Sequence, residues 1–281
     1  MDWKTWLEGR YTLKTAAAYA REIKIFLELV EDAKNADYQA ILGYIKELRQ
    51  VQKRASLNRH LQGLKKYYQW LQETEQRADN PAAALRLQDA KRERDIQVQD
   101  LLSIKQLTQL WDFFLTKNYR YKAMKNRILA IVSLLIFQGL TSEELCALVI
   151  DDIDLQAAQV RINATKTTNG RTLPLEAQQI LILHSYIEND LKAPFSLVFE
   201  KLNTDSLHYL ISSAKPELLR TKKLSPLRIR QSVIASKFKQ GWDLRKVQLF
   251  AGHRYPSSTE AYRLSGLADL KLSVEKHHPL G

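Results

Sequence analysis

One short segment of this 281-residue chain breaks the spacing of apolar residues that the rest of it follows. In "AQVRINATKTTNGRTLPL", residues 158–175, Val160 and Ile162 alternate with polar residues, which is the period of a strand. The pair Asn169-Gly170 then precedes "RTLPL", so the segment predicts a β-hairpin that turns at Asn169-Gly170. Elsewhere apolar residues recur at helical intervals. The expected fold is therefore mainly α with a small β-hairpin or sheet.

The helical spacing is clearest in "SLNRHLQGLKKYYQWL", residues 56–71. One face of this segment is apolar and consists of Leu57, Leu61, Leu64, Tyr68 and Leu71. Asn80-Pro81 ends the first helical region, and a charged run of weak periodicity follows. Helices resume at "SIKQLTQLWDFFL". We expect two domains, residues 1–88 and 100–281, joined by a linker over residues 89–99.

The chain is strongly basic, with a formal net charge of +12 and a pI near 9.6. No acidic residue occurs from Leu48 to Gln72, and the polar face of that segment carries only cations and amides. Such a face suits phosphates and base edges of double-stranded DNA, although a solvated surface is the plainer reading. The residues expected to contact DNA are Lys53, Arg54, Asn58, Arg59, Gln62, Lys65 and Lys66.

Other classes of protein are disfavoured. No run of 18 apolar residues is present, and the first residues lack the apolar core of an export signal, so we expect a cytoplasmic protein without a membrane partner. The single cysteine, Cys146, excludes an internal disulfide and a cysteine-based zinc site.

Three helix boundaries are marked in the second domain. Gly139 predicts a helix end, and Thr141 with Glu144 predicts a capping box for the next helix. Ser225 is a predicted N-cap, which places Arg228 and Arg230 in a first turn where the helix dipole disfavours cations. An anion to be bound there, or a carboxylate partner, would explain both arginines.

The segment "AGHRYPSSTEAY", residues 251–262, sets a histidine nine positions before a tyrosine. A helix is expected to end at Gly252, leaving His253 just beyond it, and Ser257 with Glu260 predicts a capping box for the helix of Tyr262. Taken singly, His253 is more often a helix cap and Tyr262 a core or surface residue.

Together, these stretches resemble a tyrosine recombinase of the phage integrase and Xer type over almost the whole chain. The resemblance rests on "LNRHLQGLKKYYQWL", "LLIFQGLTSEELCALVIDDIDL", "KTTNGRTLPL", "LRIRQSV" and "GWDLRKVQLFAGHRYPSSTEAY". It implies a two-domain C-shaped clamp on DNA, with a helical, SAM-like core-binding domain and an α+β catalytic domain.

The resemblance also implies site-specific DNA recombination, serving integration, excision or resolution, without ATP, metal or another cofactor. By motif position Tyr262 is the nucleophile that forms a 3′-phosphotyrosyl link, and Lys166 protonates the leaving oxygen. Arg228 is the second arginine of the family, and His253 hydrogen-bonds the phosphate.

Two positions depart from the family pattern. Thr141 stands where the first arginine is usual, and Ser225 stands where a histidine is usual, three residues before Arg228. These changes predict reduced activity. Arg230, two residues beyond Arg228, is expected to point away from it and is not nominated for the site.

The tail after Tyr262, with Leu267, Leu270 and Val274 on one side of a predicted helix, resembles family tails that join protomers in a DNA-bound homo- or hetero-tetramer. Packing on its own domain is the alternative for this tail. For the whole chain, the main rival to the enzyme is a weakened or inactive DNA-binding accessory relative. A basic helical RNA or membrane-surface binder explains the charge but none of the motif spacings.

Overall fold

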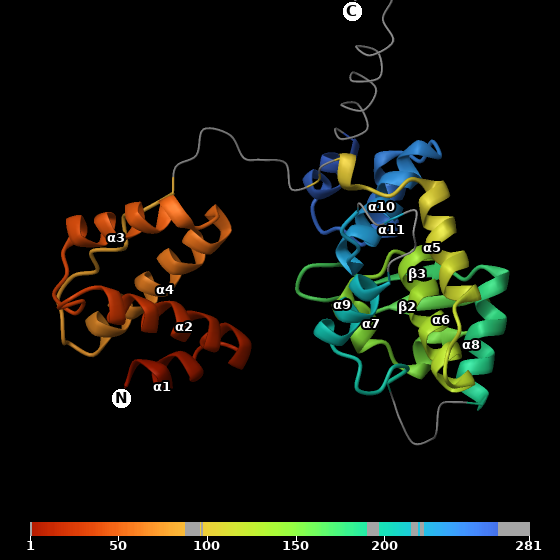
Figure 1. The fold of residues 1–281 in the computed structure, drawn as a ribbon, viewed down its shortest axis with the longest axis horizontal. Helices are drawn as coiled ribbons and strands as arrows, with labels where there is room; N and C mark the ends of the chain where they lie inside the picture. The colour runs from red at the N-terminus through yellow and green to blue at the C-terminus, as the bar shows by residue number, and fades with distance from the viewer. Residues whose placement is uncertain are drawn as a thin grey trace, which may run out of the picture. The chain divides into compact units, whose positions relative to one another are not determined.

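The computed structural model describes residues 2–87, 96, 98–189, 197–214, 219 and 222–263. The chain divides into two compact units, Met1–Arg92 and Glu93–Gly281, and Figure 1 colours them from red to orange and from yellow to blue. Most of the predicted linker 89–99, and the whole tail 264–281, lie outside the described residues.

The first unit is helical. Its helices are α1 (Trp3–Glu8), α2 (Leu13–Leu29), α3 (Tyr38–Val51) and α4 (Arg54–Glu73). The apolar face predicted for residues 56–71 is confirmed, because each of its five members is buried on α4. Phe26 of α2 meets Tyr68 of α4 at a centroid distance of 6.2 Å, and the Tyr68 hydroxyl donates to the Ala33 carbonyl at 2.7 Å. This aromatic core fixes α2 against α4.

The second unit combines helices with one antiparallel sheet. Its elements are η1 (Val98–Asp100), α5 (Ile104–Thr116), α6 (Lys122–Phe137), α7 (Ser142–Ala147), η2 (Ile150–Asp152), β1 (Ile153–Asp154), β2 (Gln159–Ile162), β3 (Arg171–Pro174), α8 (Ala177–Asn189), α9 (Thr204–Ser213), α10 (Pro226–Lys239) and α11 (Leu244–Ala251). Residues 256–263 are also helical.

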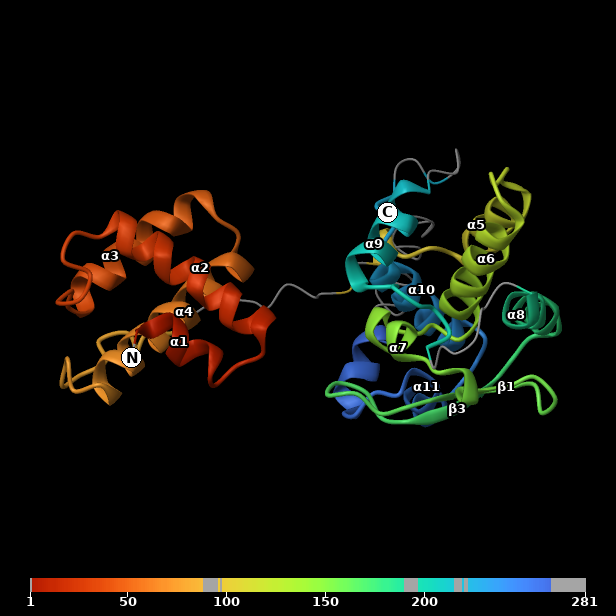
Figure 2. The ribbon, with the colours of Figure 1, turned by 90° about the horizontal axis from the view of Figure 1, so that it is seen from below.

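The core of this unit surrounds α6, where seven consecutive apolar and small residues from Ala130 to Ile136 are buried. The sheet has the order β1-β2-β3 and pairs Ile162 with Arg171. Figure 2 shows the sheet along one side of the unit, with α11 beside β3. The expectation of a mainly α fold with a small sheet is confirmed.

The turn of the hairpin differs from the prediction. The strands β2 and β3 are joined by residues 163–170 rather than by Asn169-Gly170 alone. The Thr165 N–H donates to the Thr168 carbonyl at 2.9 Å, and the Asn169 N–H donates to the Gly252 carbonyl at 2.8 Å. Tertiary pairing with the segment after α11 therefore overrides the local preference of Asn-Gly for a tight turn.

Candidate active site

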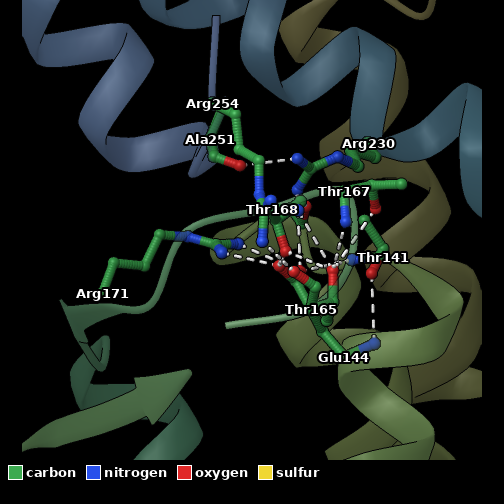
Figure 3. Close-up of polar contacts among 10 residues, drawn as sticks. Thr141, Glu144, Thr165, Thr167, Thr168, Arg171, Arg230, Ala251 and Arg254 are labelled. Atoms are coloured by element: carbon green, nitrogen blue, oxygen red, sulfur yellow. Dashed lines mark hydrogen bonds and ion pairs between the residues drawn. The ribbon is translucent and has the colours of Figure 1, made fainter. Parts of the chain in front are cut away.

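The tip of the β2–β3 loop is held by threonine hydroxyls over a buried carboxylate. Thr165 Oγ1 lies 2.9 Å from Thr168 Oγ1, and Thr168 Oγ1 donates to Glu144 Oε1 at 2.7 Å. From the other side, Arg254 Nη2 donates to the Thr165 carbonyl at 2.7 Å (Figure 3). Lys166 lies on this tip with its side chain exposed. The anchored backbone thus presents Lys166 beside the segment that carries His253.

Glu144 is the centre of a buried ionic cluster, drawn in Figure 3. Its carboxylate accepts two hydrogen bonds from Arg171, at 2.6 and 3.0 Å, and lies 3.8 Å from Arg230. Arg230 also donates to the Gly139 and Ala251 carbonyls, at 2.5 and 2.6 Å. The arginine side chains are 6% exposed and that of Glu144 is 0% exposed.

This cluster carries an excess of positive charge. Burial alone would raise the pKa of Glu144, but the hydrogen bonds of Arg171 and the charges of both arginines lower it to about 2. Two guanidinium groups therefore face one fixed carboxylate at neutral pH. The remaining positive charge, shielded from water, favours an anion such as a phosphate.

Gly252 allows the close approach of β3 to α11. It has the left-handed φ of 67° that ends α11, as predicted. A Cβ atom there would lie 2.5 Å from Arg171 Nη1 and 2.9 Å from the Asn169 carbonyl oxygen. A side chain at this position would displace Arg171 from Glu144, so the glycine is required by packing as well as by conformation.

His253 follows directly and lies between the cluster and Tyr262. Burial, with the charges of Arg230 and Arg171, lowers the pKa of His253 to about 4, so the imidazole is neutral at pH 7. Its Nδ1 lies 2.8 Å from Thr259 Oγ1. Its ring stacks on that of Tyr262, at a centroid distance of 5.7 Å and an interplanar angle of 19°.

Tyr262 is 7% exposed and packs among apolar side chains of α10 and α11: Ile234, Ala235, Val247 and Ala251. Burial raises the pKa of its phenol, and the charge of Arg230 opposes that rise. The structure thus brings Tyr262, His253 and Arg230 together.

Arg228 is placed differently from the prediction. Its Nη2 binds Asp100 Oδ2 at 2.7 Å, and it lines a separate cavity of about 880 Å³ with Lys222, Lys223 and His208. Residues two apart on a helix point about 200° apart, so Arg228 and Arg230 cannot both face His253. The arginine beside His253 and Tyr262 is Arg230, which the sequence analysis does not nominate for the site.

Thr141 and Ser225, which the sequence analysis reads as departures from the family pattern, are both helix caps. The predicted box of Thr141 and Glu144 is confirmed, with hydrogen bonds of 2.9 and 3.1 Å. Ser225 Oγ accepts from the Arg228 N–H at 3.1 Å, which confirms its N-cap role. The box predicted for Ser257 and Glu260 is wrong, because the helix already begins at residue 256 and Glu260 binds Arg263 instead.

The predicted DNA-binding residues lie together at the start and along the polar face of α4. Lys53, Arg54, Asn58 and Arg59 are exposed, whereas Gln62, Lys65 and Lys66 are half-buried. This face is free of acids in its own sequence until Glu73. However, α2 supplies one, because Glu22 lies 3.4 Å from Arg59.

Several residues of the candidate site gave little signal in the sequence. Glu144 reads as a capping residue, Arg171 as a surface strand position and Thr259 as one of a Ser/Thr run. The pairing of Thr168 with His253 joins their surroundings across about 85 residues of chain, because Thr168 donates to Glu144 and His253 contacts Thr259. Among the described residues, no three His, Cys, Asp or Glu side chains gather as a metal site. None of the described helices is long and apolar enough to cross a bilayer.

Two protein-family models match this chain. The model of the phage integrase family matches residues 100–266, and the model of the phage integrase N-terminal SAM-like domain matches residues 4–75. A tyrosine recombinase of Pseudothermotoga lettingae is 27% identical over 259 residues, covering 88% of this chain and 86% of its own length. The tyrosine recombinase XerC of Pelobacter propionicus is 26% identical, covering 94% and 89%.

Solved structures share the fold. XerH recombinase bound to its difH substrate has a TM-score of 0.73 at 16% identity, over 93% of this chain and 80% of that one. A lambda integrase dimer on a core site has a TM-score of 0.66 at 14% identity, over 92% and 74%. Because the family model covers residues 100–266, more than half of the sequence, the chain belongs to the phage integrase family.

Proposed function

We propose that this protein is a tyrosine-type site-specific DNA recombinase that cuts and rejoins double-stranded DNA through a 3′-phosphotyrosyl intermediate. One observation carries the proposal: a buried cluster with one excess positive charge lies beside the stacked rings of His253 and Tyr262. A protein that only bound DNA would have no physical need for a phenol at that place. The homologous tyrosine recombinases support the same activity.

In the proposed reaction the Tyr262 oxygen attacks a backbone phosphorus, and the phenolic proton passes to solvent water. The bond from phosphorus to the 5′ oxygen breaks, and the protonated amine of Lys166 supplies a proton to that oxygen. Reversal with a new 5′-hydroxyl rejoins the strands, so no external energy source is required. Arg230 stabilises the charge that gathers on the phosphate, and His253 donates a hydrogen bond to it.

Arg230 replaces Arg228 in this proposal. The family spacing, a histidine three residues before the arginine, then falls on Leu227 rather than Ser225. Leu227 is 64% exposed and offers no hydrogen bond. With Thr141 at the first arginine position, the site lacks two polar groups. We therefore expect a slow enzyme, with Arg171 and Arg230 supplying the cationic environment.

The first unit, proposed as the core-binding domain 1–88, contacts the DNA backbone through the polar face of α4. Each phosphate neutralised by a lysine or arginine releases a counterion, so affinity should fall steeply as salt rises. That both units bind one duplex is part of the proposal and rests on the family resemblance. A tetramer joined through residues 264–281 is part of the proposal and rests on the family resemblance alone.

The test uses a nicked suicide DNA that carries the protein's recombination site. We expect a covalent protein–DNA adduct from the unmodified protein and none from Tyr262→Phe, which keeps the ring and its stacking on His253. DNA binding by the two proteins should be equal. Binding without any adduct from the unmodified protein would favour the accessory, non-catalytic relative.

A further inference from the structure

Thr259 occupies an unusual place for a threonine in a short helix. It is 0% exposed, and its hydroxyl lies 2.8 Å from Nδ1 of His253. A helical threonine commonly turns its hydroxyl to the carbonyl four residues earlier. Among the described residues, the hydrogen bond of Thr259 Oγ1 goes instead to the imidazole of His253.

The direction of this hydrogen bond follows from the protonation of His253. A neutral imidazole has one nitrogen that donates and one that accepts. Because a buried hydroxyl proton left without an acceptor is disfavoured, Thr259 Oγ1–H donates and Nδ1 accepts. The single ring proton then lies on Nε2.

We propose that Thr259 is a positioning residue that fixes His253 in the tautomer protonated on Nε2, so that a neutral imidazole presents an N–H donor to an oxygen of the DNA phosphate. The proposal rests on the proposed recombinase function for its ligand. The hydrogen bond itself stands on the geometry of Thr259 and His253.

A neutral donor suits the neighbourhood of His253. Arg230 of α10 and Arg171 of β3 already face it, and Glu144 of α7 balances one of these charges. A third cation would add repulsion in the absence of DNA. A fixed N–H group supplies a hydrogen bond to the phosphate without that repulsion, and needs no proton uptake before the reaction.

The same contact links the histidine to the helix of the nucleophile. Thr259 and Tyr262 are three residues apart in the helical segment 256–263, so both side chains lie on one face. That face meets His253 twice, through the hydroxyl of Thr259 and through the stacked ring of Tyr262. The orientation of the imidazole is thereby tied to the position of Tyr262.

The decisive measurement is ¹⁵N NMR of histidine-labelled, full-length protein without DNA. His253 of the unmodified protein should show a protonated Nε2 and a hydrogen-bonded, unprotonated Nδ1. Thr259→Ser, which keeps the hydroxyl, should give the same pattern. Thr259→Val, which keeps the shape, should lose the Nδ1 hydrogen-bond shift. A proton on Nδ1 in the unmodified protein would overturn the proposal.

The second measurement is the rate of adduct formation on the suicide DNA. Thr259→Val should be slowed about tenfold with unchanged DNA affinity, a smaller loss than removal of a whole phosphate donor. Thr259→Ser should stay within about threefold of the unmodified protein. Equal rates for all three proteins, or an equal loss in both variants, would also overturn it. If the unmodified protein forms no adduct, the proposed function fails, whereas the NMR pattern still decides the role of Thr259.

Discussion

Each unit of this protein buries one glutamate between two arginines and near a neutral histidine. In the first unit Glu22 lies 2.6 Å from Arg21 and 3.4 Å from Arg59, and it accepts from His60 Nε2 at 2.9 Å. In the second unit Glu144 holds Arg171 and faces Arg230, with His253 beside them. The two clusters contain the same residue types, but the solvent exposure of their arginine side chains differs.

The arginine side chains of the first cluster are 58% and 51% exposed, so water and salt screen their charge. Those of the second are 6% exposed. Solvent therefore screens the excess positive charge of the first cluster, whereas the excess positive charge of the second cluster is screened much less. We infer that a buried carboxylate with two arginines serves packing when the guanidinium groups are exposed to water. The same arrangement favours binding of an anion when the guanidinium groups are buried.

The largest expected difference between the two clusters is the stability lost when the carboxylate of each is removed. Glu144→Gln leaves two buried guanidinium groups without a counterion, and we expect a loss of about 3–5 kcal/mol in the stability of the second unit. Glu22→Gln keeps an acceptor for His60 and releases arginines that water already solvates, so about 1 kcal/mol is expected. Amide hydrogen exchange, measured on peptides of each unit, reports the two effects separately.

Equal losses of stability in the two variants would contradict this prediction, because burial of the arginines would then have no effect on the stability lost with the carboxylate. A larger loss of stability for Glu22→Gln would mean that the first cluster depends on its carboxylate more than the second does. The sharper version adds a short DNA duplex and compares each variant with the unmodified protein. The phosphates should restore part of the protection that the second unit loses in Glu144→Gln, whereas in the first unit DNA should add the same protection to Glu22→Gln as to the unmodified protein.

The next contrast uses two arginines of one helix. Arg230→Gln should slow adduct formation by about 10²–10³, as expected for loss of a fixed donor to the transition state. Arg228→Gln removes a group paired with Asp100 and should change the rate by less than about threefold. Single-turnover rates at saturating DNA measure both.

Because Arg230 also binds the Gly139 and Ala251 carbonyls, Arg230→Gln could unfold part of the unit. Arg230→Lys is the matched variant, since it keeps the charge but cannot span both carbonyls with a planar fork. Its thermal transition shows whether folding survives. A rate loss in Arg228→Gln larger than in both Arg230 variants would return the catalytic role to Arg228.

These two arginines also show how far the sequence alone could lead. Periodicity, the N-cap at Ser225 and the helix end at Gly252 located α10 and α11 correctly. The motif around "LRIRQSV" contains two arginines, and only the rotation of the helix distinguishes them. In this rotation Arg230 donates to the Gly139 and Ala251 carbonyls, which lie 91 and 21 residues away. Local patterns carry no record of such contacts.

Glu144 illustrates the same limit in another form. Its capping box with Thr141 was predictable from spacing, because both partners lie within one turn. Its pairing with Arg171 depends on how a sheet packs against α7, and on a glycine at position 252 that leaves room for the guanidinium. The fold class was therefore readable from local motifs, and the family resemblance supplied Tyr262 as the proposed nucleophile, whereas the charge arrangement of the site required the tertiary structure.

The smallest contrast is between the two histidines. Burial lowers the pKa of both histidines, and each also has one glutamate that opposes the shift and two arginines that add to it. At His60 the charge of Glu22 outweighs that of either Arg59 or Arg21, whereas at His253 the charges of Arg230 and Arg171 each outweigh that of Glu144. A histidine pKa that falls on folding means that the unfolded chain binds a proton first. Stability from His253 is therefore complete above its ordinary value of 6.5 and is lost as pH falls toward about 4.

We accordingly expect acidification from pH 7 to pH 4.5 to lower hydrogen-exchange protection in the second unit more than in the first. Carboxylates also titrate in this range, so the informative quantity is the difference between each protein and its glutamine variant. His253→Gln should make the second unit clearly less sensitive to acid, while His60→Gln should alter the first unit only slightly. A protonated His60 forms an ion pair with Glu22, but a protonated His253 meets two arginines. If His253→Gln and His60→Gln reduced the acid sensitivity of their units equally, the charges around the two histidines would not differ in effect. The contrast between the two clusters would then be contradicted.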